Sequence, residues 1–385
     1  MTRIGRKIAV VINGAWRSYA SIDFDGYCHE LRRLGHSPTL VLWPASEYVE
    51  RDFPVVGAEA AEMEAAEFWQ GLGAEAAIFF NWLRAPRILA AMKQAGMHVV
   101  SRGDSDGKIS ARVFPGAAWL ALENGNDGWV RWLQKRQWWL RRCLILCAIN
   151  DRDLLETVQQ TDAVATECDE SARHLRRIFA YYKRPELSQK LHVIPHSVSD
   201  EILQQPLQTD QKPRGLICGG RWDDPQKDVH LLVATLERLL PKQEDLQVTI
   251  VGAGADNLFE SLGRRFPQIN WLRRVARRDM AQLLANSRII LSSSRWEGYS
   301  VITLEALCMG CTLVAPPLPG FVSMAEQGGY GTVSPNRSPA ALAAAIEQEL
   351  ALWDRGARVP AEIAATWRGR TNNHTVVDEL LSLIP

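Results

Sequence analysis

The sequence predicts an α/β protein with two Rossmann-like, doubly wound domains that face a central cleft. Short apolar runs alternate with stretches of helical periodicity, which is typical of parallel sheets built from βαβ units. The alternation stops once, in a polar segment, and then restarts. The length of 385 residues agrees with two domains, because a single domain usually holds about 100–200 residues.

Six apolar runs in the first half have the length of buried parallel strands. They cover residues 7–12, 38–43, 76–80, 98–101, 163–166 and 191–194. Helical patterns lie between them at about 22–34, 59–72, 86–94 and 170–182. This alternation predicts a first domain at residues 1–198.

The polar segment 199–213 contains two prolines and four glutamines, and it is predicted to be a linker. Predicted strands then follow at 215–218, 247–251, 270–272, 288–292 and 312–315. Predicted helices cover 229–240, 257–265, 278–285, 300–309 and 339–352. The second domain is therefore placed at 214–360. Residues 361–385 are predicted to form a C-terminal helix that returns to the first domain.

The charge balance, the length of the apolar runs and the cysteine content bear on which functions and which location the sequence favours. The 44 Lys and Arg residues balance 44 Asp and Glu residues, which argues against nucleic-acid binding because phosphate contacts need surplus cations. The longest apolar run, 143–149, has seven residues, far fewer than the 20 or so that span a bilayer. Seven cysteines without an export signal favour reduced thiols and a cytoplasmic location.

One strand-to-helix loop in the second half carries two carboxylates. A predicted strand ends at Ser292, Glu297 lies in the loop, and Glu305 lies eight residues further on, in the next helix. Backbone N–H groups at the helix start can bind an anion. Carboxylates on either side suit the hydroxyls of a sugar and of a ribose. The alternative is two solvated glutamates beside a turn.

A second loop, after the strand that ends at Cys218, carries two cations. Arg221 and Lys227 are six positions apart across a strand-to-helix loop. The arginine fork and the lysine point charge can hold a pyrophosphate from two sides. The alternative is that these cations pair with the neighbouring Asp223 and Asp224.

Together these loops resemble the retaining nucleotide-sugar glycosyltransferases of family 4, also called group 1, which have the GT-B fold. The family's E-x7-E pattern matches Glu297 and Glu305, and its Arg-x5-Lys pair matches Arg221 and Lys227. The glycine turn in 248–254 and the run 305–315 extend the likeness, which is high over about 215–350 and weak before 190.

The resemblance implies a hexosyl transfer with retention. It implies that the donor is a UDP- or GDP-sugar held by the second domain. It also implies that the first domain binds the acceptor, which is a hydroxyl of a glycan, a lipid-linked glycan or a small molecule. No cofactor or metal is expected. Two alternatives stay open, a nucleotide-sugar epimerase on the same fold and a non-catalytic nucleotide-sugar-binding partner subunit.

The resemblance also implies roles for individual residues. Arg221 and Lys227 would hold the diphosphate and stabilise the leaving group. Glu297 would contact the donor sugar and Glu305 the ribose. Asp104 is a fourth catalytic candidate, because it lies where many relatives carry a cleft histidine. The implied donor-binding residues are Gly14, Gly220, Arg221, Lys227, Gly252, Arg274, Val275, Glu297, Gly298, Tyr299, Ser300, Val301 and Glu305.

Two short motifs have the spacing of metal-binding motifs, but we favour another interpretation of each. The Asp104-Ser105-Asp106 tripeptide resembles a D-x-D metal motif, but an Asx turn is the alternative that we favour. The C-x-x-C spacing of Cys308 and Cys311 has no second pair to complete a zinc site, so buried thiols are expected.

The segment from Trp129 to Arg142 holds four tryptophans, five basic residues and no acidic residue. Indole rings and long cationic side chains suit an anionic membrane surface. One prediction is therefore a peripheral membrane contact that brings the enzyme to a lipid-linked acceptor. The other is a buried helix whose arginines face solvent.

Overall fold

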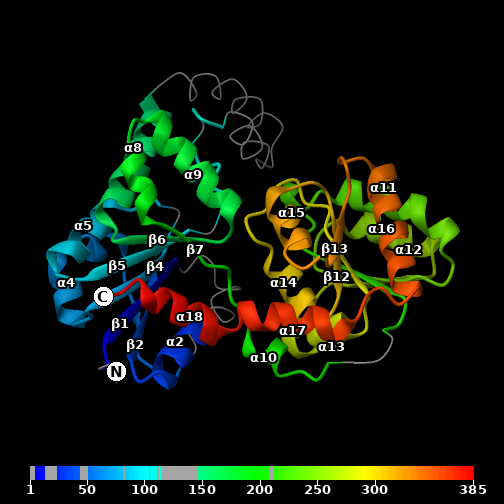
Figure 1. The fold of residues 1–385 in the computed structure, drawn as a ribbon, viewed down its shortest axis with the longest axis horizontal. Coiled ribbons are helices and arrows are strands. Elements are labelled where there is room, and N and C mark those ends of the chain that lie inside the picture. The colour runs from blue at the N-terminus through cyan, green and yellow to red at the C-terminus, as the bar shows by residue number, and fades with distance from the viewer. Residues whose placement is uncertain are drawn as a thin grey trace. The chain divides into compact units, whose positions relative to one another are not determined.

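In the computed structural model, the structure is described for residues 5–13, 24–43, 51–81, 83–103, 105–110, 112–114, 145–207 and 212–385. The chain divides into two units, Met1–Ser199 with Asn373–Pro385, and Asp200–Asn372. Each unit contains one parallel sheet with helices on its faces, which confirms the predicted α/β class (Figure 1). The segment from Trp129 to Arg142, predicted to contact a membrane, lies outside the described residues.

The first unit is built on a seven-stranded sheet in the order β3-β2-β1-β4-β5-β6-β7. Its strands are β1 (Lys7–Asn13), β2 (Ser37–Trp43), β3 (Val55–Gly57), β4 (Ala76–Phe80), β5 (His98–Arg102), β6 (Ala163–Thr166) and β7 (Leu191–Val193). Its helices are α2 (Phe24–Arg33), α3 (Ala60–Met63), α4 (Ala66–Leu72), α5 (Pro86–Gln94), α8 (Ile145–Gln160), α9 (Asp169–Tyr181), η2 (Pro185–Lys190) and α18 (Asn373–Ser382). Every strand pair is parallel, and β1 is buried on both faces.

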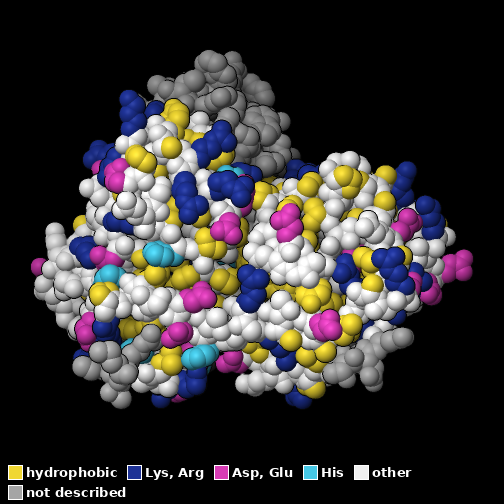
Figure 2. Space-filling model, in the orientation of Figure 1, with side chains coloured by type: hydrophobic (Ala, Val, Ile, Leu, Met, Phe, Trp, Pro, Cys, Tyr) yellow, Lys and Arg dark blue, Asp and Glu magenta, His cyan; other side chains and the backbone are white. Residues whose placement is uncertain are grey.

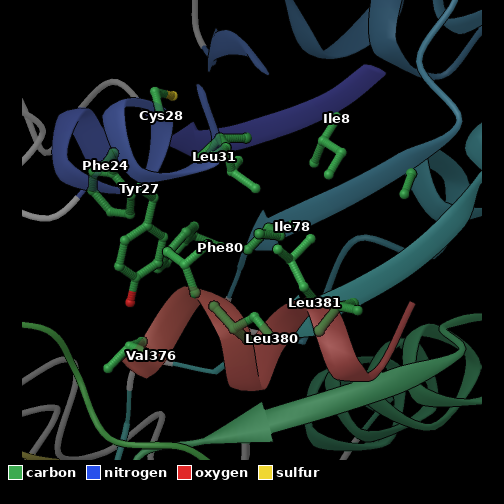
Figure 3. Close-up of a cluster of buried hydrophobic side chains, with 14 of the residues drawn as sticks. Ile8, Phe24, Tyr27, Cys28, Leu31, Ile78, Phe80, Val376, Leu380 and Leu381 are labelled. Carbon is green, nitrogen blue, oxygen red and sulfur yellow. The ribbon is translucent and has the colours of Figure 1, made fainter. Parts of the chain in front are cut away.

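The C-terminal helix α18 completes the core of the first unit. Figure 3 shows side chains of α2, β4 and α18 gathered in one buried cluster, among them Tyr27, Phe80 and Leu380. The two helices approach so closely that a Cβ on Gly26 of α2 would lie 2.6 Å from the Asn373 side chain. Residues distant in sequence therefore build one hydrophobic core here.

An ion pair closes the end of the first sheet where β5 and β6 begin. The Lys93 ammonium donates to both oxygens of Asp162, at 2.7 and 2.9 Å, and the Val99 N–H donates to the same carboxylate at 2.7 Å. Burial opposes ionisation of Asp162, but the Lys93 and Val99 hydrogen bonds, with His98 nearby, outweigh it and lower the pKa of this carboxyl below its ordinary value.

The second unit is built on a six-stranded parallel sheet in the order β10-β9-β8-β11-β12-β13. Its strands are β8 (Gly215–Gly219), β9 (Gln247–Val251), β10 (Ile269–Leu272), β11 (Ile289–Leu291), β12 (Thr312–Ala315) and β13 (Gly331–Val333). The main helices are α11 (Val229–Leu239), α12 (Asp256–Arg265), α13 (Arg277–Ala285), α14 (Val301–Cys308), α15 (Pro319–Glu326), α16 (Pro339–Asp354) and α17 (Pro360–Thr371). Shorter helices are α10 (Asp200–Leu203), η3 (Pro225–Lys227) and η4 (Leu240–Lys242).

The division differs from the predicted domain limits at two places. Within the predicted linker, 199–213, helix α10 belongs to the second unit. Lys212 in the same segment is buried, and its ammonium donates to the carbonyls of Leu284 and Ser287 at 3.0 and 2.8 Å. Burial lowers the pKa of Lys212. The predicted returning helix, 361–385, is two helices, and only α18 belongs to the first unit because the chain becomes extended at Asn372.

Figure 2 shows Lys and Arg side chains interspersed with Asp and Glu on the visible surface, as the balanced composition suggests. Among the described residues, no helix is long and apolar enough to cross a lipid bilayer.

Candidate functional site

A small pocket lies in the second unit at the point where the strand order reverses. Strands β8 and β11 are neighbours in the sheet but not in the sequence, and such a switch point leaves a crevice beyond the carboxyl ends of the strands. Residues that line the pocket include Gly219, Lys227, Ser294, Glu297, Ser300 and Thr303. The two loops that were predicted to carry the chemistry therefore meet at one pocket.

Lys227 and Glu297 form an ion pair at this pocket. The Lys227 ammonium lies 2.5 Å from Glu297 Oε1, and the two side chains are only 15% and 10% exposed. The Ser294 hydroxyl donates to the same carboxylate oxygen at 2.7 Å. The residues predicted to contact a diphosphate and a sugar are thus brought together, within reach of one bound ligand.

Arg221 lies in a different environment. Its side chain is 56% exposed and pairs with Asp224 at 2.9 Å, which is the pairing that the sequence left open. Asp224 also accepts the Gln226 N–H and so shapes the turn before Lys227. A role for Arg221 at a diphosphate stays a prediction.

Glu305 is held by an arginine that the sequence did not assign to it. Its carboxylate, 7% exposed, accepts a hydrogen bond from Arg277 Nη2 at 2.6 Å. Arg277 begins α13, and Glu305 lies in α14. The predicted donor-binding residues Arg274 and Val275 lie in the loop before α13, where Arg274 is exposed and Val275 half-buried.

The predicted glycines of the two turns allow close backbone approach. Gly252 has a φ of +120°, and a Cβ there would lie 1.8 Å from the Gly220 carbonyl oxygen. The Gly220 N–H in turn donates to the carbonyl of Val251, at 3.1 Å. A side chain at Gly252 would separate the turns that follow β8 and β9, so these glycines fix the loop that carries Lys227.

The amino end of α14 borders the same pocket. Tyr299 and Ser300 are buried just before the helix, and Val301 is its first residue. The Gly298 carbonyl oxygen packs so closely on Gly320 that a Cβ on Gly320 would lie 2.4 Å from it. Unpaired N–H groups at a helix start carry partial positive charge and suit a phosphate.

Two of the predicted site residues, Gly14 and Asp104, lie outside the described residues. The structure describes the remaining residues of the two short motifs that resemble metal-binding motifs. The Asp106 carboxylate accepts the Lys108 N–H at 3.0 Å, which is the expected Asx turn. Cys308 and Cys311 are buried, and burial raises the pKa of Cys308 to about 12. Among the residues that the structure describes, no group of three or more His, Cys, Asp or Glu side chains is arranged to hold a metal ion.

Comparison with known proteins supports the resemblance. Residues 213–351 match the family model described as Glycosyl transferases group 1. The phosphatidyl-myo-inositol mannosyltransferase of Mycobacterium tuberculosis is 26% identical over 162 residues, which are 41% of this chain and 43% of that protein. The serotype-specific mannosyltransferase WbdA of Escherichia coli is 28% identical over 146 residues, 36% of this chain and 18% of that protein. Both matches span less than half of the relative's length.

Solved structures extend the likeness to both units. HepE from Anabaena, in complex with UDP, superposes with a TM-score of 0.67 at 14% identity and covers 98% of each chain. The same protein in complex with UDP-glucose gives a TM-score of 0.61 at 15% identity, over 98% of this chain and 99% of that one. At such low identity the likeness shows the fold.

Proposed function

We propose that this protein, whose residues 213–351 match the group 1 glycosyltransferases and whose fold is GT-B, transfers a sugar from a UDP- or GDP-sugar, with retention, to an acceptor hydroxyl. The observation that carries the proposal is the Lys227–Glu297 pair beside the amino end of α14, at the switch point of the sheet. The pair offers a cation for a diphosphate and a carboxylate for sugar hydroxyls.

In the proposed mechanism, the donor diphosphate lies between Lys227 and the N–H groups that begin α14. When the bond between the sugar and the diphosphate breaks, negative charge grows on the leaving oxygen. A partly buried ammonium and a helix dipole stabilise that charge without reorganising. Glu297 accepts hydrogen bonds from the sugar. Glu305, oriented by Arg277, accepts hydrogen bonds from the two ribose hydroxyls.

The comparisons support this choice of substrates. Two relatives are named as mannosyltransferases, and HepE binds UDP and UDP-glucose. The name of the mycobacterial relative specifies a phosphatidyl-myo-inositol acceptor, which favours a lipid-linked or glycan hydroxyl as the acceptor class here. We expect no metal requirement, because Lys227 and the start of α14 supply the positive charge.

The proposal is tested by nucleotide binding without added metal. UDP, GDP, ADP and their sugar conjugates are titrated by calorimetry and by thermal shift, since a ligand of the folded state raises the melting temperature. Lys227→Ala and Glu305→Ala should each weaken binding of the nucleotide that the wild type prefers. The loss of a charge-assisted hydrogen bond costs about 1.5–3 kcal/mol, or about ten- to 150-fold in affinity.

A matched control is Lys242→Ala, which removes an exposed cation that precedes β9, at the opposite end of the strands. Equal nucleotide affinity in wild type, Lys227→Ala and Glu305→Ala would refute the site. An inverted anomeric configuration of the product, read by NMR, would refute retention. Binding without transfer to any hydroxyl acceptor would favour the alternative of a non-catalytic partner subunit.

A further inference from the structure

A three-residue ionic group lies directly beside the proposed donor pocket. Asp228 follows Lys227 in the chain, Arg295 lies in the loop of Glu297, and Arg337 lies between β13 and α16. Arg337 Nη2 is 2.6 Å and Arg295 Nε is 3.2 Å from the same oxygen, Asp228 Oδ2. The Asp228 side chain is 13% exposed, so its charge is compensated by both guanidinium groups in a largely dry environment.

Asp228 has a backbone conformation that L-residues rarely adopt. Its φ and ψ are +47° and 61°, in the left-handed region. Aspartate visits this region more readily than most residues with a Cβ, because its short side chain hydrogen-bonds locally, but the conformation still costs energy that the surrounding contacts offset. Asp228 also caps α11, because its Oδ1 accepts the Leu231 N–H at 3.4 Å. The ion pairs and the cap together hold the peptide that follows Lys227.

Arg337 reaches both of the loops that carry the proposed donor residues. Besides Asp228, it donates to the backbone carbonyls of Ser293, at 3.3 Å, and Ser294. The two loops are tied to each other at further points, since the Ser293 hydroxyl donates to the Lys227 carbonyl at 2.6 Å. Arg337 therefore contacts one loop through a side chain and the other through its backbone.

We propose that Arg337 is a positioning residue for the donor site. It holds Asp228 in the left-handed turn against the loop of residues 293–297, and it thereby fixes the Lys227 ammonium beside Glu297. The inference rests on the proposed function only in taking a nucleoside diphosphate as the ligand of Lys227. Arg337 acts through the two loops and does not itself contact the ligand.

The first test compares Arg337→Gln with Arg337→Lys and with the control Arg355→Gln, an exposed arginine after α16. Hydrogen exchange is measured on the ligand-free protein, and UDP and GDP affinity by calorimetry. Arg337→Gln should speed amide exchange at least tenfold in both loops, 224–228 and 292–297, and weaken nucleotide binding about tenfold. Arg337→Lys should recover part of the slow amide exchange and part of the nucleotide affinity, since it keeps the charge but not the planar fork.

The second test repeats Arg337→Gln in an Asp228→Gly background. Glycine adopts the left-handed conformation readily and replaces an aspartate cap at small cost. With no strained residue left to hold, the loss of Arg337 should then change affinity less than threefold. An equal tenfold loss in both backgrounds would overturn the inference, because Arg337 would not act through Asp228.

The exchange measurement distinguishes a failure of the proposed function from a failure of the inference about Arg337. If the wild type binds no nucleotide, the proposed function fails, while exchange in the free protein still decides whether Arg337 positions the loops. A lowered melting temperature in Arg337→Gln, with unchanged exchange in both loops, would mean a merely structural role and would overturn the inference.

Discussion

Replacing Glu297 by glutamine should tighten the binding of a bare nucleoside diphosphate while it lowers turnover. In the free protein, Glu297 Oε1 lies 2.5 Å from the Lys227 ammonium, so the carboxylate already pairs with this cation. A diphosphate that binds Lys227 must share this cation with a carboxylate and also approach that carboxylate. The Glu297→Gln variant keeps the size of the side chain and its ability to accept a hydrogen bond, but removes the negative charge.

The geometry sets the size of the effect. Two anions on opposite sides of one ammonium lie about 5 Å apart, given ionic hydrogen bonds of about 2.5–2.9 Å. At an effective dielectric constant of about 20, one unit of charge repulsion at that distance is worth about 3 kcal/mol. Allowing for screening in the open pocket, about 1.4 kcal/mol is a conservative expectation, which corresponds to a tenfold gain in affinity.

Calorimetric titration with UDP and with GDP, without metal, measures this gain directly. The control is Glu244→Gln, which neutralises an exposed glutamate before β9, at the opposite end of the strands from the pocket. With a sugar nucleotide as the ligand, the gain should shrink, because the neutral amide accepts weaker hydrogen bonds from the sugar hydroxyls than the carboxylate does. A Glu297→Gln variant that binds the diphosphate no better than wild type would show that the carboxylate and the phosphates do not share Lys227.

Three further predictions concern stability. Gly252→Ala should lower the melting temperature strongly, because the new Cβ would lie 1.8 Å from the Gly220 carbonyl oxygen. The control is Gly263→Ala inside α12, where nothing lies within 4 Å of the new Cβ; it should stabilise the protein by about 0.5–1 kcal/mol. Leu380→Ala should cost about 2–5 kcal/mol in the first unit, and exposed Ser382→Ala close to nothing, by denaturant titration. Asp162→Asn should destabilise the protein at neutral pH. The folded pKa of Asp162 is lowered, so the stability difference between wild type and Asp162→Asn is complete above the unfolded pKa of about 3.9. It disappears as pH falls through the folded pKa. A stability difference that persists at lower pH would show that the charge of Asp162 is not its cause.

The strands that the sequence marks most clearly are the buried ones. β1 and β4 consist of consecutive residues buried on both faces, so they are visible as apolar runs. The edge strands β3 and β13 have three residues each, all half-buried, and no apolar run marks them. The prediction therefore missed one edge strand of each sheet, whereas the other two edge strands, β7 and β10, were predicted at 191–194 and 270–272.

Local signals also located the ends of several helices. Asp228 is the kind of residue that caps a helix, and α11 begins at Val229, where the periodicity predicts it. The positive φ of Asp228 is not visible in the sequence, because the arginine that stabilises it lies 109 positions further on. Similarly, Lys212 was assigned to a linker because its buried carbonyl partners lie more than 70 positions away.

The site itself follows from motif spacing only in part. Spacing placed Glu297 in a loop and Glu305 on the next helix, as the structure has them. The partners of these residues depend on strand order, which spacing does not contain. β8 and β11 are adjacent, so the loops that follow them meet, and Lys227 reaches Glu297.

Arg277 and Glu305 require a further level of structure. Arg277 follows β10, two strands away from β8, yet α13 packs against α14 and carries the guanidinium to the carboxylate. The two ion pairs therefore have separate causes: the order of the strands brings Lys227 to Glu297, and the packing of α13 against α14 brings Arg277 to Glu305. A sequence with the same E-x7-E spacing but another strand order would separate the loops that follow β8 and β11, and the first carboxylate of the pattern would then lose the lysine that pairs with it.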